Sequence, residues 1–98
     1  MVQQSAEDAA HAHAKASVAS DYATVIRDLT PEALADLMQA AGGGWRDQLS
    51  YDLTPQGREV DDFIFDIRYE TEAGPVALKY HFRSIEGVWK IVHIEHLA

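Results

Sequence analysis

The chain has 98 residues, of which 47% are hydrophobic and 24% are charged, and its net charge is −8. This length and balance fit one globular domain with a single core. The acidic charge and the scattered Lys and Arg residues argue against binding to nucleic acid, which requires a basic patch. Cysteine is absent from the sequence, which excludes disulfides, a thiolate nucleophile and Cys-ligated zinc.

The first residues are not expected to act as a signal for secretion. The stretch MVQQSAEDAAHAHAK is acidic and alanine-rich, and it lacks the basic and apolar regions of a signal peptide. No stretch reaches the roughly 18 consecutive apolar residues that a membrane-spanning helix requires. We therefore expect residues 1–98 to form a single soluble domain that is cytoplasmic and does not enter a membrane.

Three helices are predicted over residues 6–41. Ser5 begins a capping box ahead of an alanine-rich run, and alanine favours helix. An apolar stripe at i, i+3, i+4 and i+7 marks a second helix over residues 22–29. Thr30 and Pro31 fit the N-cap and the first turn of a third helix.

Beyond Trp45 the apolar period changes to two, which predicts a sheet over residues 45–97. The expected strands are a short one over 48–53, which ends in a turn over 54–57, and three longer ones over 62–71, 76–83 and 88–97. Helices followed by an antiparallel meander of about four strands predict an α+β domain with the helices on one face of the sheet.

Strict alternation divides the last strand, GVWKIVHIEHLA, into two faces. The face toward the helices is expected to carry Trp89, Ile91, His93 and Glu95, and the outer face to carry Val92, Ile94 and His96. The two histidines of the HIEH stretch are therefore expected on opposite sides of the sheet.

The stretch ASVASDYATVIRDLTPEALADLM, over residues 16–38, resembles the opening of nuclear transport factor 2-like (SnoaL-like, cystatin-like fold) domains. The closing stretch FRSIEGVWKIVHIEHL, over residues 82–97, resembles their last hairpin. The resemblance implies a curved antiparallel sheet wrapped around the helices, a cone-shaped cavity between them, and homodimers formed through the outer sheet face. The family includes isomerases, dehydratases, cyclases and domains without catalysis, so this fold does not fix a function.

The first functional hypothesis is a small homodimeric binding or scaffold module with a shallow apolar pocket for a small molecule. The segment between Met38 and Asp61 is shorter than in typical members of the family, which is why a shallow pocket is expected. The predicted pocket residues are Tyr22, Phe65, Tyr69, Tyr80 and Trp89. No cofactor is predicted.

The second hypothesis is a cofactor-independent enzyme, such as an isomerase, dehydratase or cyclase. A buried His93 beside Glu95 would have the perturbed pKa that general acid–base catalysis uses. The alternative is that both side chains lie at the open end of the sheet, partly solvated, and bond to helix ends or to each other.

A metal site is not predicted. His93 and Glu95 share a face as i and i+2 on a strand, but two ligands are too few, and a third would have to come from His11, His13 or elsewhere. His11 and His13 are themselves about 200° apart on a helix. They are expected to be exposed residues of an alanine helix.

The outer sheet face is predicted to be the dimer interface. Val92 and Ile94 are apolar there, Ile64 and Ala77 are expected beside them across the sheet, and His96 is expected near the seam. An apolar centre with a charged rim is typical of an association surface. The alternative is that these are scattered surface aliphatics. A third hypothesis is an accessory domain that uses this face to pair with another protein.

Trp45 follows three glycines and has two interpretations. It is either the aromatic residue of a mobile lid or a cap over the open end of the core.

Overall fold

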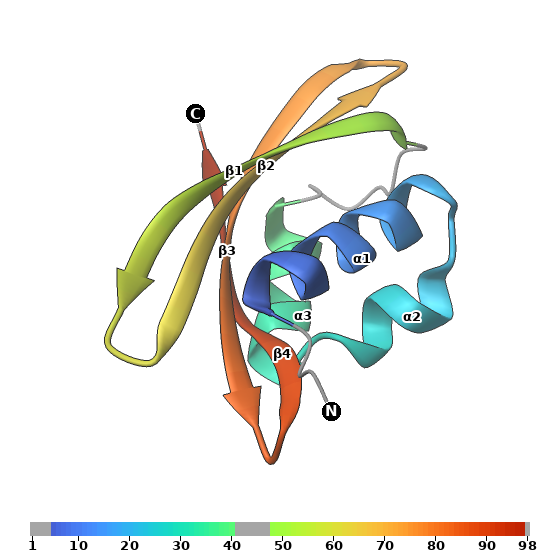
Figure 1. The fold of residues 1–98 in the computed structure, drawn as a ribbon. Helices are drawn as coiled ribbons and strands as arrows, with labels where there is room; N and C mark the ends of the chain where they lie inside the picture. Colours follow the sequence, from blue (N-terminus) through green and yellow to red (C-terminus); the bar gives the residue numbers. More distant parts are fainter. Residues whose placement is uncertain (1–4, 41–47, 98) are drawn as a thin grey trace.

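The computed structural model describes residues 5–40 and 48–97. Its elements are α1 (Ala6–Val18), α2 (Tyr22–Arg27), α3 (Pro31–Ala40), β1 (Gln48–Glu59), β2 (Asp62–Thr71), β3 (Gly74–Ile85) and β4 (Val88–Leu97). The strands form one antiparallel sheet in the order β1-β2-β3-β4. The sheet curves around helices that gather on one of its faces, which confirms the predicted α+β class (Figure 1). Trp45 lies outside the described residues.

The predicted helix starts are confirmed by their caps. The Ser5 hydroxyl accepts a hydrogen bond from the backbone N–H of Asp8 at 3.1 Å, and the Thr30 hydroxyl accepts one from Ala33 at 3.3 Å. These bonds satisfy N–H groups that have no partner within the helix. None of the described helices is long and apolar enough to cross a lipid bilayer.

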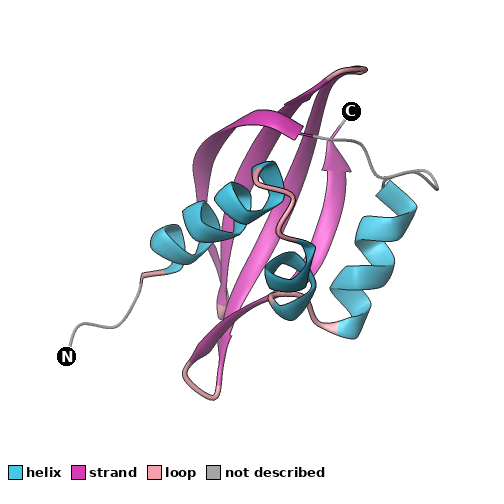
Figure 2. Cartoon of the chain, turned by 90° about the vertical axis from the view of Figure 1, so that its right-hand side faces the viewer, coloured by secondary structure: helices cyan, strands magenta, loops and turns pink. Residues whose placement is uncertain are grey.

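The core lies between the helices and the face of the sheet that curves toward them (Figure 2). The side of α1 that meets the sheet is made almost entirely of methyl groups, so the helix axis approaches the strands closely. Its buried alanines are Ala6, Ala9, Ala10 and Ala14. The sheet supplies the bulk on the other side, through Phe65, Ile67, Tyr69, Leu78, Tyr80, Phe82, Ile91 and Ile94.

Two tyrosines are packed in the core between the helices and the sheet. Tyr69 and Tyr80 are 0% and 2% exposed, and their hydroxyl oxygens lie 3.4 Å apart. Burial raises the pKa of Tyr80 well above its usual value, and burial also raises the pKa of Tyr69. Both phenols therefore stay neutral, and they act as packed core residues.

β4 departs from strict alternation because it contains a bulge. Phe82 pairs with Ile91, but the next pair is His81 with His93, so Val92 is one residue too many. A one-residue bulge reverses the direction of every side chain beyond it. The predicted assignment of faces is correct up to Ile91 and wrong after it.

Beyond the bulge the two faces are exchanged. Ile94 pairs with Tyr80, is 4% exposed and joins the core. His93 and Glu95, predicted to face the helices, lie on the outer face with side chains that are 46% and 50% exposed. His96, predicted on the outer face, falls on the core side near the end of the strand, where it is exposed.

The free edge of β4 is covered by the segment that joins α2 to α3 and by α3 itself. Ile91 donates its N–H to the carbonyl oxygen of Asp28 at 2.7 Å, and Thr30 donates its N–H to the carbonyl of Ile91 at 3.0 Å. Further along the strand, the Asp36 carboxylate accepts the N–H of Ile94 at 3.2 Å. This edge therefore offers few free backbone groups to another strand.

β1 is longer than predicted. The expected turn over 54–57 is wrong, because the strand runs on from Gln48 to Glu59. The register shifts between Pro55 and Gly57, and Gly57 has a φ of 104°, which a glycine adopts without strain. Proline and a bulge are both tolerated on an edge strand, where no neighbour needs the missing N–H.

The turn between β1 and β2 holds a strained residue. Val60 has a φ of 54° and is 89% exposed. A β-branched side chain in this left-handed region costs about 1–2 kcal/mol, whereas asparagine tolerates it. We expect Val60→Asn to raise the free energy of unfolding by roughly 1 kcal/mol, measured by urea denaturation. Val88→Asn, at another exposed valine with a negative φ, should give no gain. Equal effects of the two changes would contradict the explanation.

Candidate functional site

The predicted pocket residues do not surround a common cavity. Phe65, Tyr69 and Tyr80 are packed in the core, and Tyr22 is 42% exposed on α2. Of the five, only Trp89 borders the cavity described next, and it packs edge-on against Phe63 with ring centroids 5.5 Å apart. The sequence placed the aromatic residues on the correct face but could not show that α1 fills the space above them.

A cavity of about 400 Å³ lies to one side of the core, between α1, α2 and the β3–β4 hairpin. We call it the hairpin cavity. Its apolar wall is formed by Ala9, Phe82, Val88 and Trp89, and its polar wall includes Arg27, Asp28 and Ser84. The β3–β4 hairpin, whose end forms one side of this cavity, extends past the helices (Figure 1).

A buried histidine stands behind the polar wall of the hairpin cavity. His13 is 1% exposed, and its Nδ1 lies 3.1 Å from Oδ2 of Asp28. The imidazole packs against the rings of Tyr80 and Phe82, with centroids 5.5 Å and 6.3 Å away. The prediction that His13 is exposed is wrong.

The signal for a buried His13 was present in the helical period. It shares a face with Ala10, Ala9 and Ala6, which lie three, four and seven residues earlier, and this face meets the sheet. His11, about 200° around the helix from His13, is half-buried, and its Nδ1 lies 2.9 Å from the hydroxyl of Tyr51. The two histidines therefore serve different contacts, as their angular separation predicts.

The His13–Asp28 pair gives the cavity wall a group that can exchange protons. With Nδ1 protonated, His13 donates to one carboxylate oxygen of Asp28 and fixes the orientation of the carboxylate. The other oxygen lies 3.8 Å from the guanidinium of Arg27, which is largely exposed. An oriented carboxylate beside a cavity can accept a hydrogen bond or a proton from a bound molecule.

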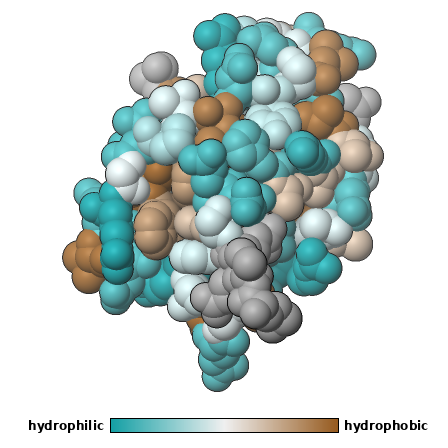
Figure 3. All heavy atoms as spheres, viewed as in Figure 1, coloured by the Kyte–Doolittle hydropathy of each residue, from teal (hydrophilic) through white to brown (hydrophobic). Residues whose placement is uncertain are grey.

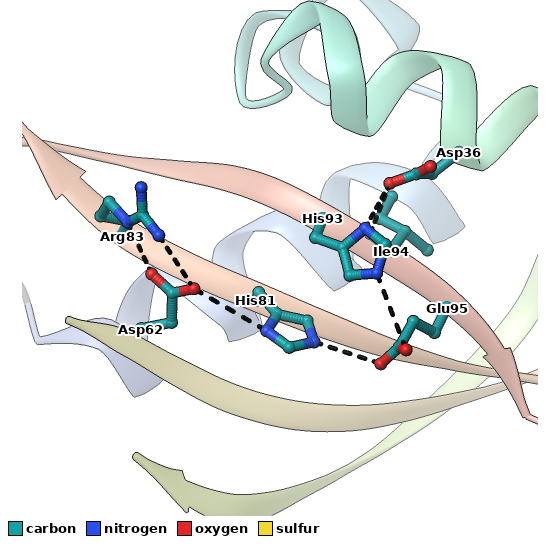
Figure 4. Close-up of polar contacts among 7 residues, drawn as sticks. All are labelled: Asp36, Asp62, His81, Arg83, His93, Ile94 and Glu95. Atoms are coloured by element: carbon teal, nitrogen blue, oxygen red, sulfur yellow. Dashed lines mark hydrogen bonds and ion pairs between the residues drawn. The ribbon is translucent and has the colours of Figure 1, made fainter. Parts of the chain in front are cut away.

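A second group of titratable side chains lies on the outer sheet face (Figure 4). We call it the outer cluster, and its members are Asp36, Asp62, His81, Arg83, His93 and Glu95. At one end, Arg83 donates to Asp62 at 2.6 Å, and this hydrogen bond raises the pKa of Arg83. At the other end, the carboxylate of Asp36 reaches the cluster from α3.

The middle of the outer cluster joins two histidines to one carboxylate. Nε2 of His81 lies 3.2 Å from Oε2 of Glu95, and Nε2 of His93 lies 3.7 Å from Oε1 of the same residue. Nδ1 of His93 lies 2.6 Å from Asp36, and Nδ1 of His81 lies 3.8 Å from Asp62. The hydrogen bond from His81 lowers the pKa of Glu95, so this carboxylate is ionised at neutral pH.

Of the three residues in the middle of the outer cluster, His81 is the one that the sequence analysis did not name as a site residue. It lies on a neighbouring strand, 12 residues before His93, and only the bulge places the two opposite each other. Their ring centroids are 5.1 Å apart. Alternation on β3 puts Tyr80 and Phe82 in the core, which leaves His81 on the outer face. Cross-strand pairing was the only signal that could have revealed the group.

The residues predicted for the dimer interface do not form one apolar surface. Ile94 belongs to the core, Ile64 is 5% exposed, and Ala77 and Val92 are half-buried. The outer face carries mainly polar and charged residues, among them Asp62, Asp66, Arg68, Lys79, His81, Arg83 and Glu95. On the side of the molecule seen in Figure 3, hydrophobic residues are interspersed with hydrophilic ones and do not gather into one patch.

Comparison of the chain with protein-family models, with curated proteins and with solved structures found no match. The resemblance to nuclear transport factor 2-like domains therefore stays a prediction. Function has to be argued from the hairpin cavity and the outer cluster themselves.

Proposed function

We propose that the chain is a small-molecule-binding domain and that its ligand occupies the hairpin cavity. The observation that carries the proposal is a carboxylate oriented by a buried imidazole at the wall of a space of about 400 Å³. Pockets for small ligands typically measure about 300–1,000 Å³ and combine apolar walls with a few fixed polar groups. The pair of His13 and Asp28 supplies such a fixed group.

The lining indicates the chemistry of the ligand. Phe82 and Trp89 offer ring surface to an apolar or aromatic body. Asp28 has one oxygen engaged by His13, and the other, 3.8 Å from the exposed guanidinium of Arg27, keeps a lone pair that can accept a hydrogen bond from a ligand. A ligand hydroxyl or amine is the matching donor. We therefore propose a small aromatic or alicyclic alcohol or amine as the class of ligand.

The proposal is tested by ligand-observed NMR with a set of small aromatic alcohols and amines. We expect several of them to bind the wild-type chain and to lose binding in Ser84→Tyr, in which a ring fills the cavity from an exposed strand position. Asp28→Asn should weaken the binding of amines more than the binding of alcohols, because it removes the negative charge of the side chain and keeps an acceptor oxygen.

Ser50→Tyr is the matched control, because Ser50 is also exposed on a strand but does not line the hairpin cavity. It should bind the same compounds as the wild type. If both tyrosine variants behave alike, or if no compound binds the wild type, the hairpin cavity is not a ligand site.

A further inference from the structure

We propose that His81, His93 and Glu95 bind one divalent transition-metal ion, with zinc as the best match. Within the part of the chain that the structure describes, these three residues can each offer a ligand atom within 4.8 Å of the others. Two come from β4 and one from β3, and the bulge at Val92 brings them onto the same face. The site is separate from the hairpin cavity and does not depend on the function proposed there.

The distances require little movement. Zinc binds imidazole nitrogen and carboxylate oxygen at about 2.0–2.2 Å, so tetrahedral ligand atoms lie roughly 3.3 Å apart. The two contacts from the imidazole Nε2 atoms of His81 and His93 to Glu95 are already 3.2 Å and 3.7 Å. Small side-chain rotations are enough to direct both nitrogens and one carboxylate oxygen at a common point.

Both histidines have a second carboxylate behind them. Nδ1 of His93 lies 2.6 Å from Asp36, and Nδ1 of His81 lies 3.8 Å from Asp62. In the absence of an ion, Nε2–H of His81 donates to Glu95. When an ion displaces that proton, the proton at Nδ1 stays beside the carboxylate behind the ring, and the lone pair of Nε2 faces the ion. Metal-binding histidines commonly have this support, which fixes the ring and raises its basicity.

The supporting carboxylates are themselves anchored. Asp36 also accepts the backbone N–H of Ile94 at 3.2 Å, and Asp62 is held by Arg83 at 2.6 Å. The His93 ring is therefore held both by strand pairing and by its hydrogen bond to Asp36, and the His81 ring has the anchored carboxylate of Asp62 3.8 Å from its Nδ1. A chance group of exposed side chains would lack this second layer of contacts.

The donor set selects the kind of ion. Two imidazoles and one carboxylate suit zinc and its neighbours in the first transition series, whereas magnesium and calcium prefer oxygen ligands. The carboxylates near this point belong to Asp36, Asp62 and Glu95. The nearby cations are Lys79 and Arg83, and Arg83 is already paired with Asp62, so the local charge favours a cation. Three protein ligands leave a coordination position for water or for a donor from another molecule.

A surface network of ion pairs would look similar but would respond differently. Such a network gains nothing from a metal, whereas a metal site binds its ion through the lone pairs of the imidazoles and discriminates between ions. The competing explanations are therefore separated by measuring metal binding directly on the chain without a histidine tag.

The experiment is calorimetric titration of zinc into the untagged protein, together with visible spectroscopy of the cobalt(II) form. We expect one zinc ion to bind per chain with a dissociation constant in the micromolar range or below. We also expect the cobalt(II) form to show a visible absorption band that is stronger than that of the hydrated ion, as it does when cobalt has few ligands in a site of low symmetry. Asp36→Asn should weaken zinc by roughly 10- to 100-fold, as loss of a supporting carboxylate does elsewhere. His81→Ala and Glu95→Gln should weaken it further and abolish the cobalt band.

His96→Ala is the matched control, since His96 is an exposed histidine on β4 that lies outside the cluster. It should bind zinc as the wild type does, and circular dichroism should show all variants to be folded. The proposal is overturned if His81→Ala keeps the affinity of the wild type, if His96→Ala loses as much as His81→Ala, or if magnesium binds as tightly as zinc.

Discussion

Ile94→Ala is expected to lower the free energy of unfolding by about 2–4 kcal/mol, the usual cost of removing a large aliphatic side chain from a packed core. Ile94 is 4% exposed and packs in the cluster that contains Tyr80 and Leu37. The loss follows from the bulge, because strict alternation would place this side chain on the outer face, where alanine would cost little. The change in the free energy of unfolding is measured by urea denaturation, with circular dichroism as the signal.

Val92→Ala is the matched comparison, at the half-buried residue of the bulge. It should cost clearly less than Ile94→Ala. A more severe change, Ile94→Lys, should prevent stable folding because it places an unpaired charge in the core. If Ile94→Lys instead folds normally and changes only the mass in solution, the residue lies at an interface between copies and the core assignment is wrong.

Asp28→Ala is the second change with a large expected effect. It removes the partner of a histidine that is 1% exposed, and a buried polar group without a partner costs about 1–3 kcal/mol. His13→Ala should cost at least as much, because it also leaves a hollow beside Tyr80 and Phe82. Both are measured by denaturation at neutral pH in the absence of ligand.

A double change isolates the hydrogen bond from the packing. His13→Leu keeps most of the volume of the ring, and in His13→Leu with Asp28→Ala neither polar group is left without its partner. We expect the double variant to lose less stability than the sum of the two single changes. Strict additivity would mean that the imidazole and the carboxylate do not interact across their 3.1 Å contact.

The helices could be predicted because their signals are local. Ser5 and Thr30 cap the helices that they were expected to cap, and Pro31 takes the first helical position. β2 begins and ends at the predicted residues, because Phe63, Phe65, Ile67 and Tyr69 follow a period of two without interruption. Such features depend on neighbours within a few residues and need no knowledge of the remaining fold.

The last strand could not be divided correctly, because a bulge depends on two strands and the helix beside them. One hint was available, since Ile91 and Ile94 are both large aliphatic residues at an odd spacing. A regular strand cannot bury both on one face. Both are buried because Val92 is an extra residue in β4 with no partner of its own in β3, which turns Ile94 to the same side as Ile91.

The two candidate sites were predicted incompletely, for different reasons. His13 was assigned to solvent because its neighbours are small, yet small neighbours are what allow α1 to lie close to the sheet. His81 was overlooked because it is distant in sequence from His93 and Glu95, and a metal was dismissed for want of a third ligand. Both errors concern contacts between elements, which a single sequence does not specify.

The two edges of the sheet differ, and the difference limits how copies of the chain could assemble. The edge of β4 is closed by the segment around Asp28 and Thr30 and by Asp36, whereas among the described residues no strand pairs with the outer edge of β1. A sheet of this kind can grow in one direction only. Two copies joined through β1 would present a closed β4 edge on either side, so assembly would stop at two and could not continue into a fibre.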